Sequence, residues 1–173
     1  MKTEIKYGLI TGAGVCLWVM TVYFLGFHTA PEKMHIGEYS GFFSYIIPIV
    51  CLYLGIKNKR DKELGGYIRF GQGLTTGFLM TLITALITVI FFFIYNKFIN
   101  TDWMEIGIEY TRKKLVVEGL NPAEISLRIE NMRKMYTLKM QLTGAFIGTI
   151  IQGMILSVVI SFILRKENKS IAS

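Results

Sequence analysis

Charged side chains are missing from four long stretches of this 173-residue chain. The longest stretch, residues 70–96, runs for 27 residues without Asp, Glu, Lys, Arg or His. About 20 apolar residues in a helix are enough to cross the roughly 30 Å hydrocarbon core of a bilayer. The chain is also 52% hydrophobic, which is high for an ordinary soluble domain. The sequence therefore predicts a polytopic membrane protein.

Signatures of catalysis are missing as well. The chain has no G-x-S-x-G, P-loop, H-E-x-x-H or C-x-x-C pattern. Its two cysteines, Cys16 and Cys51, lie among apolar or small residues inside predicted spans, which favours two buried thiols over a disulfide. The spans also lack the ionisable residues that pumps and ion transporters place inside the membrane. We therefore expect a protein that is not an enzyme and needs no cofactor.

One short loop, residues 28–38, holds four side chains of metal-ligand type. They are His28, Glu32, His35 and Glu38. A metal site needs convergent geometry and supporting hydrogen bonds, and Pro31 leaves this loop without a helical i,i+4 register. A solvated loop is therefore favoured over a metal site.

The uncharged windows define a single membrane domain, residues 1–173, with four predicted spans. The spans are about residues 7–27, 39–56, 70–96 and 142–164. Pro48 lies near the middle of the second span, where it removes one backbone hydrogen bond and kinks the helix. Because the freed carbonyl needs a partner in lipid, we expect this span to pack against other helices.

The segments outside the spans differ in charge. Residues 1–6, 57–69 and 165–173 hold ten basic and four acidic residues in 28 positions, whereas residues 28–38 and 97–139 hold nine basic and eight acidic residues in 54. Basic residues concentrate on the cytoplasmic side of membrane proteins, so both termini are predicted to be cytoplasmic. The net charge of +7 thus indicates topology and a lipid bilayer as partner, not nucleic acid.

The polar section 101–140 has the pattern of two helices. Gly119 is a typical residue to end the first, and Asn121-Pro122-Ala123-Glu124 has the order of a capping box that starts the second. The predicted fold is therefore all-α, with four transmembrane helices and an extracytoplasmic helical hairpin between spans three and four. We expect Trp103 and Tyr110 of the first helix to pack near Met132 and Tyr136 of the second.

Small residues recur at four-residue spacing within the spans. Such faces let helix backbones approach closely in lipid, and they predict either packing within the four-helix bundle or a surface for association with a second copy or another membrane protein. Gln152, the one strongly polar group at depth, is either an interhelical hydrogen-bonding group or a substrate contact. The predicted packing residues are Gly8, Gly12, Gly73, Gly77, Gly144, Gly148, Gly153 and Ser157.

Several short segments resemble one protein family in the order in which they occur. They are Tyr7-Gly8-Leu9-Ile10, Ile68-Arg69-Phe70, Gly77-Phe78, the capped helix from Asn121, and residues 157–166. Together they resemble the uncharacterised bacterial membrane-protein family known as domain of unknown function 4199 (DUF4199), found mostly in Bacteroidota. The resemblance implies four spans and a bacterial inner-membrane location. It implies no activity and no catalytic residues.

Three functions are compatible with these features. The leading hypothesis is a non-enzymatic inner-membrane protein that acts by helix–helix association with membrane or envelope partners. The alternative is a small oligomeric transport or channel subunit, with a pore lined by the Thr and Gly faces of the last two spans. A third is a sensor, in which the hairpin binds a ligand and residues 57–69 contact anionic lipid heads.

The orientation can be tested by cysteine labelling. A cysteine in place of Asn58 is expected to be shielded from a membrane-impermeant thiol reagent in intact cells, and a cysteine in place of Asn121 is expected to react. The expectation follows from the higher density of basic residues in the segments assigned to the cytoplasm. Labelling at Asn58 without lysis would contradict this orientation.

Overall fold

The structure, a computed structural model, describes residues 2–166 and is helical throughout that range apart from short turns and one isolated backbone bridge. The predicted tail beyond Lys166 lies outside the described residues, as does Met1. Four helical segments are long and apolar enough to cross a membrane, namely Thr3–Phe24, Pro31–Glu63, Phe70–Ile99 and Leu138–Leu164. The predicted all-α fold with four apolar spans is confirmed to this extent.

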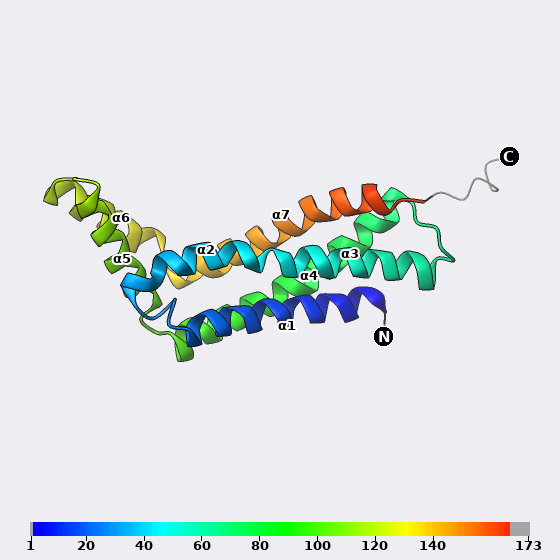
Figure 1. Ribbon diagram of the computed structural model, residues 1–173, viewed down its shortest axis with the longest axis horizontal. Helices are drawn as coiled ribbons and strands as arrows, with labels where there is room; N and C mark the ends of the chain where they lie inside the picture. The colour runs from blue at the N-terminus through cyan, green and yellow to red at the C-terminus, as the bar shows by residue number, and fades with distance from the viewer. Residues whose placement is uncertain (1, 167–173) are drawn as a thin grey trace.

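Helix α4 (Phe70–Ile94) is the centre of the bundle. It packs along α7 (Leu138–Leu164) and, on another side, along α1 (Thr3–Phe24), and one π-helical turn, Tyr95–Ile99, prolongs it. The N-terminus and the last described residues lie at one end of the bundle, and helices α5 and α6 project from the other end (Figure 1). The two ends of the bundle therefore differ: one holds the N-terminus and the last described residues, and the other holds helices α5 and α6.

The second span is interrupted near its middle. It begins with a 3-10 turn (Pro31–Lys33), continues as α2 (Met34–Ser44) and α3 (Ile46–Asn58), and closes with a π turn (Lys59–Glu63). The nitrogen of Pro48 has no hydrogen to donate to the carbonyl of Ser44, and α2 ends at that residue. Helix α3 packs against α1, α7 and α4, whereas α2 contacts mainly α1 and α3. The packing against other helices that we expected for the second span is therefore made mostly by its second half, α3.

The helices approach α4 closely because small residues line the contacts. A Cβ added to Gly73 would lie 2.7 Å from the Oγ of Ser161, and Gly77 would meet Ser157. On the other side of α4, a Cβ on Gly8 or Gly12 would lie 2.8 or 2.7 Å from the side chain of Ile83 or Ile87, respectively. Real Cβ atoms do not come so near. These glycines therefore set the separation of α1, α4 and α7.

Polar contacts tie the chain together at the end that holds the N-terminus. The amide of Thr3 donates to Glu63 Oε1 over 3.2 Å, and Asn58 Nδ2 donates to Thr3 Oγ1 over 2.8 Å. The ammonium of Lys59 lies 2.8 Å from Glu4 Oε1 and 2.6 Å from Glu63 Oε2. The start of α1 is thus joined to the end of the second span.

Helices α5 (Trp103–Val117) and α6 (Pro122–Met135) lie side by side and share an apolar cluster. Gly119 turns the chain between them at φ +81°, with the amide of Leu120 donating to the carbonyl of Leu115, as in a Schellman motif. Asn121 and Glu124 make both bonds of the predicted capping box. The cluster contains Ile108, Leu115, Ile125 and Ile129, with Met104, Leu120 and Met132 against it.

The aromatic residues of α5 lie outside this cluster: Trp103 and Tyr110 line a cavity together with Met132 and Tyr136, and both also contact the segment 28–38. Trp103 packs on His28, with ring centroids 4.6 Å apart, and the hydroxyl of Tyr110 donates to Glu38 Oε2 over 3.0 Å. Across the pair, Arg133 forks onto the carboxylate of Glu105, which lowers the pKa of Glu105. The aromatic face of α5 thus contacts the segment 28–38.

The close contact between α4 and α7 predicts the effect of one added methyl group. Gly77→Ala is expected to lower the stability in detergent by about 1 to 3 kcal/mol, because the new Cβ would overlap Ser157. Gly71→Ala is a matched control on the same helix, since nothing lies within 4 Å of its added Cβ. Thermal unfolding of the two variants measures the difference, and equal melting temperatures would rule out the close approach.

Candidate functional site

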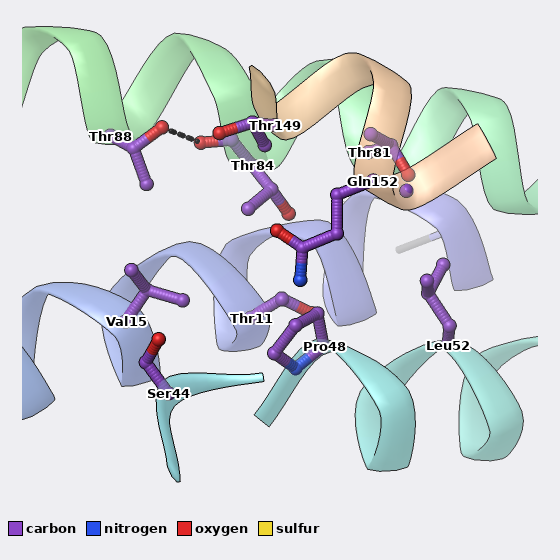
Figure 2. A pocket seen from close by; sticks show the side chains of 11 residues that line it. Thr11, Val15, Ser44, Pro48, Leu52, Thr81, Thr84, Thr88, Thr149 and Gln152 are labelled. Atoms are coloured by element: carbon purple, nitrogen blue, oxygen red, sulfur yellow. Dashed lines mark hydrogen bonds between the residues drawn. The ribbon is translucent and has the colours of Figure 1, made fainter. Parts of the chain in front are cut away.

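A cavity of about 80 Å³, lined by both apolar and polar groups, lies between the four spans (Figure 2). Each span contributes residues from near its middle: α1 contributes Thr11, the second span Pro48, α4 Thr84 and α7 Gln152. If the four spans cross a bilayer, a cavity at the midpoint of every span lies near the depth of the bilayer centre. It is therefore the place where polar groups have the least access to bulk water.

Gln152 is the principal polar group of the cavity. Its side chain extends from α7 toward Thr11 and Pro48 (Figure 2). No hydrogen bond to a described residue holds its amide in place. An amide has two donors and two acceptor lone pairs. A cavity volume of about 10 to 15 Å³ is enough for one water molecule, so this cavity of about 80 Å³ admits several waters that can satisfy the amide.

Four of the five threonines that line the cavity donate their hydroxyl hydrogen within the protein, whereas the hydroxyl of Thr149 donates to no described residue. Thr11 donates to the carbonyl of Tyr7 over 2.6 Å, and Thr88 donates to the carbonyl of Thr84 over 3.0 Å, as Figure 2 shows. Thr81 likewise donates to its own helix, to Gly77. These residues therefore offer the cavity methyl groups and acceptor lone pairs. The free donors come from the amide of Gln152 and the hydroxyl of Thr149.

Thr84 has an additional role, because its hydroxyl reaches two helices. It lies 3.0 Å from the carbonyl of Met80 in α4 and 3.2 Å from the carbonyl of Gly8 in α1. The second contact is possible because Gly8 brings the α1 backbone close to α4. The glycine contact and the cavity wall are thus parts of one interface.

The lining of the cavity carries no formal charge. Ions in membrane proteins are held by ionisable side chains or by arrays of carbonyl groups. An uncharged site with one amide and several hydroxyl acceptors suits water or a small neutral polar molecule. Sequence reasoning singled out Gln152 but did not connect it with Thr11, Ser44 or Pro48, although a proline and a glutamine at the same depth are a signal for such a cavity.

The predicted packing residues divide into two groups. Gly144 and Gly148 lie on the exposed side of α7, with nothing within 4 Å of an added Cβ, so neither packs against a helix within residues 2–166. Of the two roles that the sequence left open for small residues, packing inside the bundle is not observed for these two glycines, because the rotation of α7 turns them outward. The residues at helix contacts are Gly8, Gly12, Gly73, Gly77, Gly153 and Ser157.

The loop residues considered as metal ligands have other partners. His28 Nδ1 lies 3.1 Å from the hydroxyl of Tyr95, and His35 Nδ1 lies 2.9 Å from the carbonyl of Glu32. Burial lowers the pKa of His28, which favours the neutral imidazole. Among the described residues, no three His, Cys, Asp or Glu side chains are placed to hold a metal ion.

Comparison with protein families identifies the chain. The family model described as a protein of unknown function (DUF4199) matches residues 6–166. The chain belongs to this family. The match contains nearly all of the four spans and both helices α5 and α6, so the cavity is built entirely from the DUF4199 region. Neither the curated proteins nor the solved structures contain a match to the chain.

The double contact of Thr84 leads to a testable difference between two threonines. Thr84→Val keeps the shape of the side chain but removes the bond from α4 to Gly8, and should cost about 0.6 to 1.7 kcal/mol in detergent. Thr75→Val is the control, because its hydroxyl is exposed and donates only within α4, to Gly71. If both variants unfold at the same temperature, the contact with Gly8 contributes nothing.

Proposed function

We propose that this DUF4199 protein is a non-enzymatic, multi-pass membrane protein that acts by helix–helix association through the outward face of α7. The observation that supports the proposal is the position of Gly144 and Gly148. Both lie one turn apart on the exposed side of α7 with nothing within 4 Å of an added Cβ, whereas Gly153 of the same helix is buried against Thr81 of α4.

The residues around this glycine pair suit a helix contact in lipid. Ile147, Ile151 and Ile155 are at least half exposed on the same helix, so the glycines form a shallow groove between β-branched side chains. Two small residues four apart allow two helix backbones to approach within van der Waals contact, which drives association where the hydrophobic effect is weak. The partner proposed first is a second copy of the chain.

The proposal includes a location in the bacterial inner membrane, both termini in the cytoplasm, and helices α5 and α6 as an extracytoplasmic hairpin. It is supported by charge, because basic residues concentrate at the end of the bundle that holds the N-terminus. They are Lys2, Lys6, Lys57, Lys59, Arg60, Lys62, Arg69, Arg165 and Lys166.

A second candidate function is a small oligomeric transport or channel subunit. It is favoured by the break between α2 and α3 beside the central cavity, because discontinuous helices at mid-membrane depth are a feature of transporter binding sites. The small, uncharged cavity limits this function to small neutral solutes. Uptake of urea or glycerol into proteoliposomes that is abolished by Gln152→Leu would favour transport over association.

The proposed association predicts the effect of filling the outward groove. Gly148→Leu, alone or with Gly144→Leu, is expected to weaken self-association about tenfold, because the side chains separate the two backbones. Energy transfer between labelled copies, measured over a range of protein-to-lipid ratios, gives the change. Gly71→Leu is the control, since Gly71 is also open to the outside but lies on α4.

Two results would count against self-association. One is equal energy transfer for the wild-type protein and both α7 variants. The other is a wild-type protein that stays monomeric at every density. In that second case, co-purification from the native membrane tests the remaining form of the proposal, in which another membrane protein binds the α7 face and is lost from Gly148→Leu.

A further inference from the structure

A second cavity, about 260 Å³ in volume, lies at the end of the bundle from which α5 and α6 project. It is formed by the start of α2, the aromatic side of α5, the end of α6 and the first turn of α7. It is separate from the central cavity, because no residue lines both. Its volume is slightly below the range of about 300 to 1,000 Å³ for drug-sized ligand sites, so it suits a group of a few heavy atoms.

Aromatic and sulfur-containing side chains dominate the walls. Trp103, Tyr110 and Tyr136 line the cavity. Three methionines, Met34, Met104 and Met132, line it as well. The face of an aromatic ring is electron-rich and attracts cations, and the thioether of methionine is polarizable. These walls favour a ligand that combines apolar groups with positive charge.

One formal negative charge belongs to this cavity. Among the described residues that line it, Glu38 is the only Asp, Glu, Lys or Arg. Tyr110 donates its hydroxyl to Glu38 Oε2, and no described residue donates to Oε1. The lining imidazole of His28 is kept neutral by burial, which lowers its pKa. The carboxylate of Glu38 therefore has no counter-charge within the cavity.

Two other polar side chains of the lining, Thr111 and Gln141, each have a donor bonded elsewhere. Thr111 donates to the carbonyl of Gly107 over 2.9 Å, and Gln141 Nε2 donates to the carbonyl of Tyr136 over 3.0 Å. These two residues leave for a ligand the lone pairs of a hydroxyl and of an amide oxygen and one N–H of Gln141, and the hydroxyl of Tyr136 is bonded to no described residue. Because Glu38 carries the one formal charge among the described lining residues, the cavity complements a cation better than an anion.

We propose that this cavity binds a small organic cation, an alkylammonium or quaternary ammonium group, with Glu38 as its counter-charge and Trp103, Tyr110 and Tyr136 as its aromatic walls. The inference is independent of association through α7, because the two surfaces share no residue. The cation can come from a lipid headgroup or from a free amine, and the chemistry of recognition is the same for both.

Calorimetric titration of the detergent-solubilised full chain with choline tests the proposal. We expect choline to bind at least tenfold more tightly than 3,3-dimethylbutanol, which has the same shape without the charge. Glu38→Gln should reduce choline affinity at least tenfold and leave the neutral alcohol unaffected. Glu32→Gln is the matched control, because it removes a carboxylate from the same segment but outside the cavity. Melting temperatures of both variants confirm that they fold.

Nanodiscs distinguish the two sources of the cation. Choline binding in phosphatidylglycerol discs that is lost in phosphatidylcholine discs supports a lipid headgroup, and binding in both supports a free amine. The proposal is overturned if choline binds in neither medium, if the neutral alcohol binds as tightly as choline, or if Glu38→Gln binds choline like the wild-type protein. The comparison of choline with the alcohol needs no variant, so it holds even if Glu38→Gln fails to fold.

Discussion

The close approach of α1 and α7 to α4 is the constraint on which the structure depends. In a bilayer the hydrophobic effect does not drive helices together, so their packing relies on van der Waals contact and on hydrogen bonds between helices. Glycines at 8, 12, 73 and 77 remove the side chains that would hold the backbones apart. The same approach brings the carbonyl of Gly8 within 3.2 Å of the Thr84 hydroxyl. One geometric condition thus creates both kinds of contact.

Polar groups inside the bundle are arranged around this contact. Most buried hydroxyls of α4 donate one turn back along their own helix, so they cost little in a medium without water. The second span differs from α4, because its backbone hydrogen bonding is interrupted between Ser44 and Pro48, where the ring of proline removes a donor. The central cavity lies beside that break and contains the amide of Gln152. A water-sized space next to a freed carbonyl is the expected compensation for an interrupted helix.

The sequence was sufficient for features that depend on local chemistry. Uncharged windows located the spans, and Gly119, Asn121 and Glu124 located the turn and the helix start, because caps involve residues close in the chain. The four-residue repeats did not show that Gly153 and Ser157 face α4 while Gly144 and Gly148 face outward. That difference depends on how α7 is rotated, which neighbouring helices decide. The additional partners of Trp103 and Tyr110, His28 and Glu38, were missed for the same reason, since they lie in segment 28–38, far away in sequence.

Helix α2 connects the two cavities. Its first turns contribute Met34, Gly37 and Glu38 to the cation site, and its last residue, Ser44, lines the central cavity. The helix contacts mainly α1 and α3, ends at a break, and exposes Tyr39, Phe42 and Phe43. Such an element can shift at lower cost than α4, which is held on two sides by glycine contacts. A cation bound at Glu38 would therefore act on a helix whose displacement also changes the central cavity, whereas the α4 interfaces would stay in place.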